Sequence, residues 1–421
     1  MSVQVAIVHY AAPPVVGGVE STIRHHARHL ALAGYDVHVI AGRGGTFDPR
    51  VSTHVIPLLD GRHDVVAGIS RELAQGRVPP ELEDLAARIA GEVRPLLAAA
   101  DVRIVHNAHT LHKNLPLTVA LERLTEENPG GWIAWCHDFA FRDPLYASDL
   151  HSGRPWDLLR TAWKGVTYVA VSEDRRAMLA ELLGLPLSAV RAVPGGLDVE
   201  AFLGLGADTR RLCDVLGLHD LHPLILLPAR ITRRKNIELA LHVLAAMRKL
   251  PGGEQAGLVV TGPPGPHNPT NASYLNLLLE LRDALGLLGH AHFLYQAGDD
   301  GRPLHVSDAM MAELYRLADG MILPSRAEGF GIPVLEAGLA RLPMALADLP
   351  PLRETAGEEA LFFSPDGDPE PIAAAFLERI TSSPSQRLRR RVREHYSWSA
   401  ICSKKLIPLI EETQAHAARP A

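Results

Sequence analysis

Two glutamates, Glu328 and Glu336, are separated by seven residues and flank a glycine-rich turn. Gly329 and Gly331 leave the backbone amides of this turn accessible, and Pro333 suits the first turn of a helix. Amides at a helix start attract phosphate, and carboxylates accept strong hydrogen bonds from sugar or ribose hydroxyls. The pattern therefore predicts a phosphate and sugar site, with a surface turn as the alternative. The predicted contacts are Glu328, Gly329, Phe330, Gly331, Ile332 and Glu336.

A basic loop, residues 229–236, follows the first apolar run of the second half of the chain. Arg230 could bind a diphosphate in bidentate fashion, and Lys235 could add a point charge. The alternative is a solvated basic face, which is the reading that we expect for Arg233 and Arg234.

Further polar residues follow predicted strands in the first half. Gly17 and Gly18 form a turn, and His137 and Asp138 end an apolar run. The carboxyl ends of parallel strands line the ligand crevice of a doubly wound sheet. Asp138 could instead cap a helix, and His137 could be a core histidine. Because no G-x-G-x-x-G occurs, the sequence does not support a nicotinamide or flavin site.

A histidine-rich segment, His106–Asn114, also follows a predicted strand. Its spacing matches no zinc pattern, so we expect no metal. These side chains could bind an anionic acceptor, with loop solvation as the alternative. The predicted acceptor residues are His9, His109, His112, Lys113 and Asp138.

Two weaker signals lie in the second half of the chain. The loop of residues 261–269 is rich in glycine and proline, and Gly262 would border a nucleotide. Tyr295 and Gln296 follow the next predicted strand and could meet the base through backbone groups.

Apolar β-rich runs alternate with helical patterns along the whole chain, which predicts α/β architecture with parallel sheets. The pattern restarts after a proline- and glycine-rich stretch near residues 194–207. We therefore expect two doubly wound, Rossmann-like domains, residues 1–200 and 201–397. A C-terminal helix, about 398–421, is expected to pack back on the first domain.

The composition excludes several classes. The chain has 421 residues, 47% hydrophobic and 21% charged, with a formal net charge of -6. Neither half is basic, which argues against nucleic acid as a partner. Three scattered cysteines argue against a disulfide framework, and no signal peptide or transmembrane run is evident. We expect a cytoplasmic protein; the sequence does not indicate an oligomeric state.

Taken in order, the motifs resemble those of the retaining glycosyltransferases of family 4, which have the GT-B fold. The matching residues are Gly17-Gly18, His137-Asp138, Pro194–Phe202, Arg230 with Lys235, and Glu328-Gly-Phe-Gly331 ending in Glu336. The resemblance covers nearly the whole chain. It implies two Rossmann-like domains facing a central cleft, with the donor in the second domain and the acceptor in the first.

The resemblance also implies a mechanism, in which a hexose (glucose or mannose) moves with retention from a nucleotide-diphosphate sugar to an acceptor. His137, Arg230, Lys235 and Glu328 would be catalytic, and Gly17 and Gly18 would approach the donor. We expect no cofactor and no metal. The net acidic first domain favours a soluble acceptor. The histidines around Lys113 suggest a small anionic one such as glycerate, a glycosylglycerate or a sugar phosphate.

Other functions remain open. A sugar-nucleotide epimerase of the same fold, or transfer to a glycan or lipid-linked acceptor, would use similar residues. A phosphorylase would need a Schiff-base lysine that we cannot place. A non-catalytic nucleotide-sugar-binding module is disfavoured because Arg230, Lys235, Glu328 and Glu336 are all present. A dehydrogenase is disfavoured because the sequence lacks the G-x-G-x-x-G fingerprint.

Overall fold

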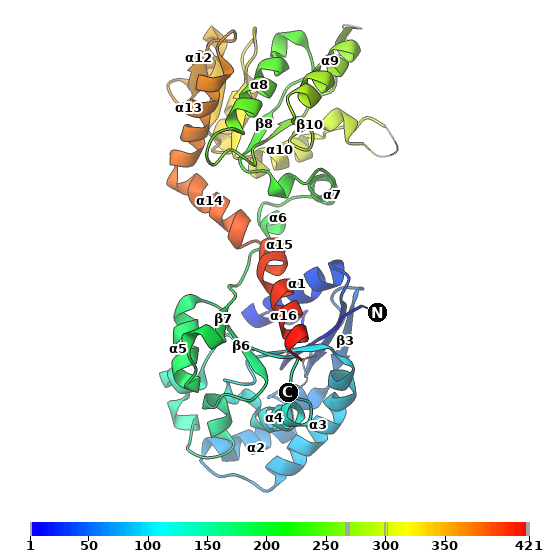
Figure 1. Cartoon of the computed structure of the whole chain (residues 1–421), viewed down its shortest axis with the longest axis vertical. Helices are drawn as coiled ribbons and strands as arrows, with labels where there is room; N and C mark the ends of the chain where they lie inside the picture. Colours follow the sequence, from blue (N-terminus) through cyan, green and yellow to red (C-terminus); the bar gives the residue numbers. More distant parts are fainter. Residues whose placement is uncertain (1, 266–269, 299, 301, 418–421) are drawn as a thin grey trace. The chain divides into compact units, whose positions relative to one another are not determined.

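The computed structural model describes residues 2–265, 270–298, 300 and 302–417. Contacts divide the chain into two compact units. Unit 1 comprises Met1–Leu197 and His395–Ala421, and unit 2 comprises Asp198–Glu394. In Figure 1 the blue-to-green chain and the red C-terminal helices belong to unit 1, whereas the green-to-orange chain forms unit 2. Residues 418–421 of the predicted C-terminal helix lie outside the described ranges, as do residues 266–269 of the predicted loop.

Unit 1 is built on a parallel sheet of seven strands in the order β3-β2-β1-β4-β5-β6-β7. Its central strands are continuous apolar runs because helices cover both faces. The strands are β1 (Gln4–His9), β2 (Asp36–Ala41), β3 (Val51–Val55), β4 (Val102–His106), β5 (Trp132–Cys136), β6 (Val166–Ala170) and β7 (Val190–Ala192).

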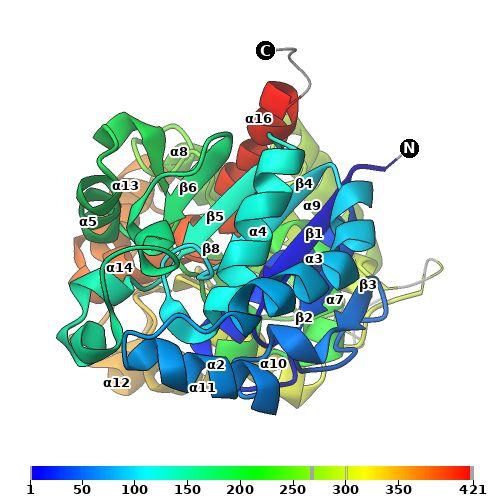
Figure 2. The same cartoon turned by 90° about the horizontal axis from the view of Figure 1, so that it is seen from below.

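Alternate residues of β1 face two cores. Ala6 and Val8 pack with helices α2 (Asp64–Ala74), α3 (Glu81–Ala99) and α4 (Leu115–Glu127). Figure 2 shows α3 and α4 in front of the strands of this sheet.

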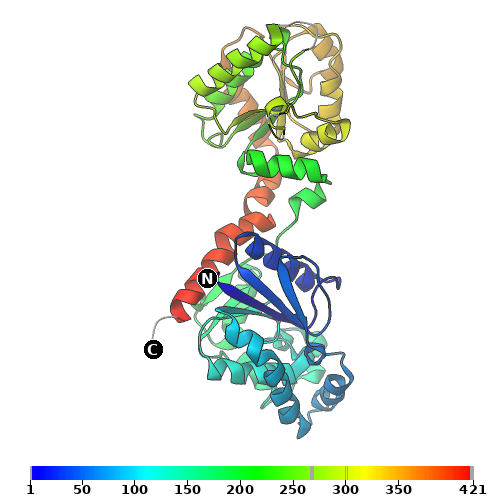
Figure 3. The same cartoon turned by 90° about the vertical axis from the view of Figure 1, so that its right-hand side faces the viewer.

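Val5 and Ile7 pack on the opposite face, with α1 (Gly18–Leu32) and the C-terminal segment. Figure 3 shows the red α16 beside the blue strands of this unit. The remaining helices of unit 1 are α5 (Glu173–Leu183), α15 (Trp398–Ile401), the π-helical turn η11 (Cys402–Leu406) and α16 (Ile407–Ala417).

Unit 2 contains a parallel sheet of six strands in the order β10-β9-β8-β11-β12-β13. The strands are β8 (Leu224–Leu227), β9 (Gly257–Val260), β10 (Ala291–Phe293), β11 (Gly320–Leu323), β12 (Met344–Ala347) and β13 (Leu361–Phe363). One face packs on α8 (Ile237–Met247), α9 (Thr270–Ala284) and α13 (Pro369–Ser382). The other face packs on α7 (Ala207–Leu216), α10 (Asp308–Leu317), α11 (Ile332–Leu339) and α12 (Pro350–Ala356). Two further helices are α6 (Val199–Phe202) and α14 (Pro384–His395).

The predicted α/β class with two doubly wound, parallel-stranded sheets is confirmed. In each sheet the strand order reverses once, between β1 and β4 and between β8 and β11. Ligands of such sheets bind outside the carboxyl ends of the strands at this reversal. The loops that follow these four strands are therefore the first places to examine for a site. Within the described ranges, no helix is both long enough and apolar enough to cross a membrane.

Candidate functional site

The strand reversal of unit 2 brings together the basic loop after β8 and the glycine-rich turn after β11. Lys235 ends a short 3-10 helix, η8 (Arg233–Lys235), and its Nζ forms an ion pair with the Glu328 carboxylate. Both side chains are about nine-tenths buried, with 11% and 9% of their surfaces exposed. Ser325, fully buried, donates a hydrogen bond to Glu328 Oε1 at 2.6 Å. The carboxylate is thus fixed at the carboxyl edge of the sheet.

Two further residues join the same loops. The amide of Asn236 donates to the carbonyl oxygens of Pro324 at 3.0 Å and Pro365 at 2.8 Å, from a backbone at φ 53°. Arg234 donates to the Ala327 carbonyl at 3.2 Å and lies 3.8 Å from Glu328 Oε2. Arg234 is exposed, as expected for a solvated face, but its guanidinium also contacts the turn that holds Glu328.

Arg233 differs from its neighbour. Its guanidinium lies 4.9 Å from the centre of the Tyr274 ring, and the residue is exposed. It therefore points away from the Glu328 carboxylate and stays a surface group.

Helix α11 begins at the end of the glycine-rich turn. Gly331 precedes it at φ 97°, and a Cβ at this position would lie 2.7 Å from Leu352 Cδ2. Glycine is therefore required here by both backbone and packing. Glu336 lies in α11, where its Oε2 accepts a hydrogen bond from the buried Tyr315 hydroxyl at 2.7 Å. Burial, followed by this bond, raises the pKa of Tyr315. Gly329, Phe330 and Ile332 of this turn are exposed.

Arg230 and Gly262 lie next to each other on neighbouring loops. A Cβ on Gly262 would be 2.4 Å from the Ala229 carbonyl oxygen and 2.6 Å from Arg230 Cα, so only glycine allows this approach. Arg230 is exposed and has no hydrogen bond or ion pair to another described residue. Its guanidinium is therefore available to an anion.

Tyr295 and Gln296 end a 3-10 turn, η9 (Leu294–Gln296), directly after edge strand β10. The Tyr295 carbonyl accepts the Leu304 amide at 3.1 Å, and Gln296 is exposed. The backbone carbonyl of Tyr295 is thus already hydrogen-bonded within the chain.

The strand reversal of unit 1 is organised by Asn107, which directly follows β4. Asn107 is 3% exposed, at φ 62°, and its Oδ1 accepts the backbone N–H of His137 at 2.7 Å and of Asp138 at 3.3 Å. Thr110 donates to the Asp138 carbonyl at 2.7 Å. The loop after β5 is therefore held by side chains of the loop after β4. Asn107 was not among the predicted site residues, although asparagine at a strand end tolerates this backbone conformation.

Three histidines form a chain of contacts at the same edge. His106 Nδ1 lies 3.0 Å from His137 Nε2, and His9 Nδ1 lies 3.1 Å from the His106 carbonyl oxygen. Burial lowers the pKa of His9 and of His137 to about 4. Burial, with His137 and His26 nearby, also lowers the pKa of His106 well below its ordinary value. These imidazoles are therefore neutral near pH 7 and can hold a fixed tautomer.

A cavity of about 300 Å³ in unit 1 is lined by the predicted acceptor residues His112 and Lys113. Arg71 and Ser70 of α2 line it as well, together with Asp149. His112 Nε2 lies 3.6 Å from Asp149 Oδ2. Burial lowers the pKa of His112, although Asp149 opposes this effect. Arg71 and Ser70 were missed from the sequence because no motif marks them.

The other predicted residues of unit 1 have varied environments. His109 is 2% exposed and its ring centre lies 4.2 Å from that of Trp163, so it belongs to the core under the strand ends. Asp138 is exposed and does not cap the following 3-10 turn, whose N-cap position is Phe139 with no side-chain cap hydrogen bond. Gly17 is extended at φ -178°, and nothing lies within 4 Å of where a Cβ of Gly18 would be. The chain itself therefore does not require a glycine at Gly18.

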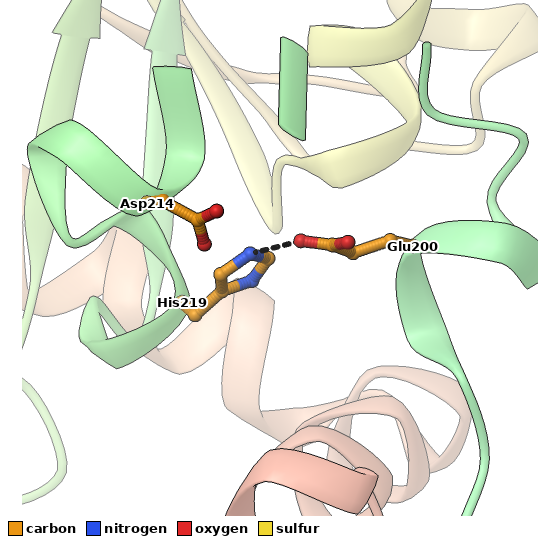
Figure 4. Close-up of side chains that lie close together, drawn as sticks. All are labelled: Glu200, Asp214 and His219. Carbon is orange, nitrogen blue, oxygen red and sulfur yellow. Dashed lines mark hydrogen bonds and ion pairs between the residues drawn. The ribbon is translucent and has the colours of Figure 1, made fainter. Parts of the chain in front are cut away.

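Three potential metal ligands lie close together in unit 2, outside the predicted site. The ligand atoms of Glu200, Asp214 and His219 lie within 4.8 Å of one another. Figure 4 shows the three side chains. His219 Nε2 is 2.8 Å from Glu200 Oε1, and Arg210 lies 3.7 Å from Glu200 Oε2. The His219 and Arg210 contacts lower the pKa of Glu200. The Arg210 cation and the His219 ring thus already contact the Glu200 carboxylate, which makes the group a poor cation site.

Comparison with known proteins assigns both halves of the chain. Residues 16–201 match the model for Glycosyltransferase Family 4, and residues 214–395 match the model for Glycosyl transferases group 1. The serotype-specific mannosyltransferase WbdA of Escherichia coli is 40% identical over 74 residues, which are 18% of this chain and 9% of WbdA. The matched part thus spans less than a tenth of that relative.

Other relatives match over greater lengths. The D-inositol 3-phosphate glycosyltransferase of Salinispora tropica is 25% identical over 444 residues, covering 100% of this chain and 86% of that protein. Among solved structures, sucrose-phosphate synthase of Thermosynechococcus elongatus is 19% identical, covering 98% of this chain and 100% of that chain at a TM-score of 0.39. Because the two family models together account for most of the sequence, the chain belongs to the glycosyltransferases that join a family 4 domain to a group 1 domain.

Proposed function

We propose that this protein transfers a hexose, glucose or mannose, from a nucleotide-diphosphate sugar to a small acceptor that carries a phosphate or carboxylate. The observation that carries the donor half is the meeting of Lys235, Arg234 and Glu328 between the loops after β8 and β11. Cations at this point would neutralise a diphosphate leaving group, and Glu328 would accept hydrogen bonds from sugar hydroxyls.

Donor binding would replace the ion pair between Lys235 and Glu328. Lys235 is paired with Glu328, and a diphosphate would compete for the ammonium group. Release of the carboxylate would then free its oxygens for the sugar. Arg230, which has no partner among the described residues, would add the second charge, and Glu336, oriented by Tyr315, would hold the ribose.

The cavity beside Lys113 supports an anionic acceptor. Arg71 and Lys113 place two cationic side chains around a space of about 300 Å³, with a single carboxylate, Asp149, among the lining residues. Arginine and lysine both bind phosphate well. The relative from Salinispora tropica is named for a phosphorylated acceptor, and WbdA for mannosyl transfer, which agrees with this choice.

The proposed reaction breaks the bond between the anomeric carbon and the diphosphate oxygen, which keeps the electron pair. The acceptor hydroxyl oxygen forms the new bond on the same face, and its proton passes to the departing phosphate. His137 would orient the sugar, since Asn107 fixes its backbone and His106 its ring. We propose that neither a metal ion nor a cofactor takes part, because arginine and lysine occupy the diphosphate position.

The proposal is tested with Lys235→Ala and Glu328→Gln, and with Arg326→Ala as a matched control. Arg326 lies in the same turn but is exposed and pairs with Asp366. We expect Lys235→Ala and Glu328→Gln each to lower kcat by about 100-fold or more, as for loss of one transition-state contact. Arg326→Ala should keep its activity. Near-normal turnover of Lys235→Ala or Glu328→Gln, with far-ultraviolet circular dichroism unchanged, would contradict the assignment.

A further inference from the structure

The opposite edge of the unit 2 sheet contains a second cavity, of about 260 Å³. His222 lies just before β8 and Asp319 just before β11, so the cavity opens at the amino ends of these strands. Arg387, Arg390 and Arg391 of α14 line it as well. The proposed donor site lies at the carboxyl ends of the same strands. The two places are therefore separate.

Arginines dominate the wall of this cavity. Helix α14 carries five of them, at positions 387, 389, 390, 391 and 393, and the two carboxylates beside the cavity are Asp319 and Glu394. Arg393 holds Asp319 at 2.9 Å and Arg389 lies 3.3 Å from it, while Arg390 holds Glu394 at 2.7 Å. Each carboxylate thus has an arginine partner, and three arginines line the cavity against two carboxylates.

Two buried polar atoms of the cavity lack a partner among the described residues. Nδ1 of His222, a residue that is 7% exposed, forms no hydrogen bond, and neither does Oε1 of Gln386. Buried polar atoms in proteins nearly always have partners, and a bound ligand is one way to supply them. The imidazole can donate to an anion that the guanidinium groups attract.

We propose that this cavity binds a phosphate-bearing small molecule, at a site distinct from the donor and acceptor sites. Arginine is suited to this ligand because its planar guanidinium forms two parallel hydrogen bonds to phosphate oxygens. Arg387 is the leading contact: its Nη1 donates to the carbonyl oxygens of Thr381 and Ser382, which orients the group beside the cavity.

The test uses arginine modification by phenylglyoxal, mapped by peptide mass spectrometry on the full-length protein. Inorganic phosphate and pyrophosphate are compared with chloride at equal ionic strength. With phosphate or pyrophosphate about ten-fold above its Kd, we expect modification of Arg387 and Arg391 to slow about ten-fold. Arg282 of α9, paired with Asp283, is the control and should react at an unchanged rate. Equal rates at Arg387 and Arg391 with every salt would overturn the proposal.

A second measurement separates this site from the donor site. Pyrophosphate binding is measured by calorimetry in Lys235→Ala, with and without the added changes Arg387→Glu and Arg391→Glu. Both added positions are exposed, so the fold should be retained. We expect Lys235→Ala to bind pyrophosphate and the triple variant to bind at least about ten-fold more weakly, since the charge-assisted contacts of two arginines are lost. Equal affinity of the two proteins would refute the site.

Discussion

The Asn107 side chain is expected to hold the loop of His137 and Asp138 at a measurable cost when it is removed. Asn107→Ala leaves the partly buried N–H of His137 without its partner at 2.7 Å and loses the longer bond to Asp138 at 3.3 Å. An unpaired buried donor costs about 1–3 kcal/mol, and alanine at φ 62° costs about 1 kcal/mol more than asparagine. We therefore expect unit 1 to lose about 3 kcal/mol of unfolding free energy.

The chain offers a selective probe for this loss. All five tryptophans, Trp132, Trp135, Trp156, Trp163 and Trp398, belong to unit 1, so urea unfolding followed by tryptophan fluorescence reports on unit 1 alone.

Two matched variants divide the effect into its parts. Asn107→Gly removes the acceptor but relieves the backbone, and should cost about 2 kcal/mol. Asn107→Asp keeps an oxygen at the same place and should cost less than about 1 kcal/mol. If Asn107→Ala unfolds at the same urea concentration as the wild type, or as Asn107→Asp, the described role of this side chain is wrong.

Two other expectations follow from the same geometry. Burial lowers the pKa of His9 and His137 to about 4 and that of His26 and His109 to about 3. Between pH 6.5 and these values, the four histidines bind protons in the unfolded chain but stay neutral in the folded one. The free energy of unfolding is therefore unaffected by these groups above pH 6.5. It falls by about 1.4 kcal/mol per histidine for each pH unit as the pH drops toward 4. The urea midpoint of tryptophan fluorescence should therefore be lower at pH 5.5 than at pH 7.5, and equal midpoints would contradict the buried neutral state. Arg71→Ala should raise KM for a phosphorylated acceptor about ten-fold with kcat little changed, as for loss of a ground-state contact, whereas a fall in kcat alone would argue against the acceptor cavity.

The sequence predicted the architecture well because the strands of both units are buried apolar runs. The apolar runs Asp36–Ala41, Trp132–Cys136 and Gly320–Leu323 each predict a strand, and β2, β5 and β11 have these same bounds. The sequence does not predict β3 and β13, because β3 is partly exposed with three polar residues in its middle and β13 has only three residues.

The candidate site was less predictable. Glu328 and Lys235 stand out by their motif, and the structure brings them together. Three supporting side chains could not be predicted: Asn107, Ser325 and Tyr315. Each acts by a hydrogen bond to a residue 3 to 31 positions away, and the sequence does not show which residues are in contact. Arg71 comes to Lys113 only through the packing of α2 against the loop after β4. Side chains that support others carry no motif of their own.

The most direct test of the proposed function is a transfer assay read by mass spectrometry. The purified protein is mixed with UDP-glucose, UDP-galactose, UDP-N-acetylglucosamine, GDP-mannose or ADP-glucose, together with glycerate, a hexose phosphate or an inositol phosphate, with and without EDTA. We predict a hexosylated anionic acceptor from a glucose or mannose donor, formed equally with EDTA and about 100-fold more slowly by Lys235→Ala. If no donor yields a product or releases its nucleoside diphosphate, or if EDTA abolishes transfer, the account of a metal-independent hexosyltransferase is contradicted.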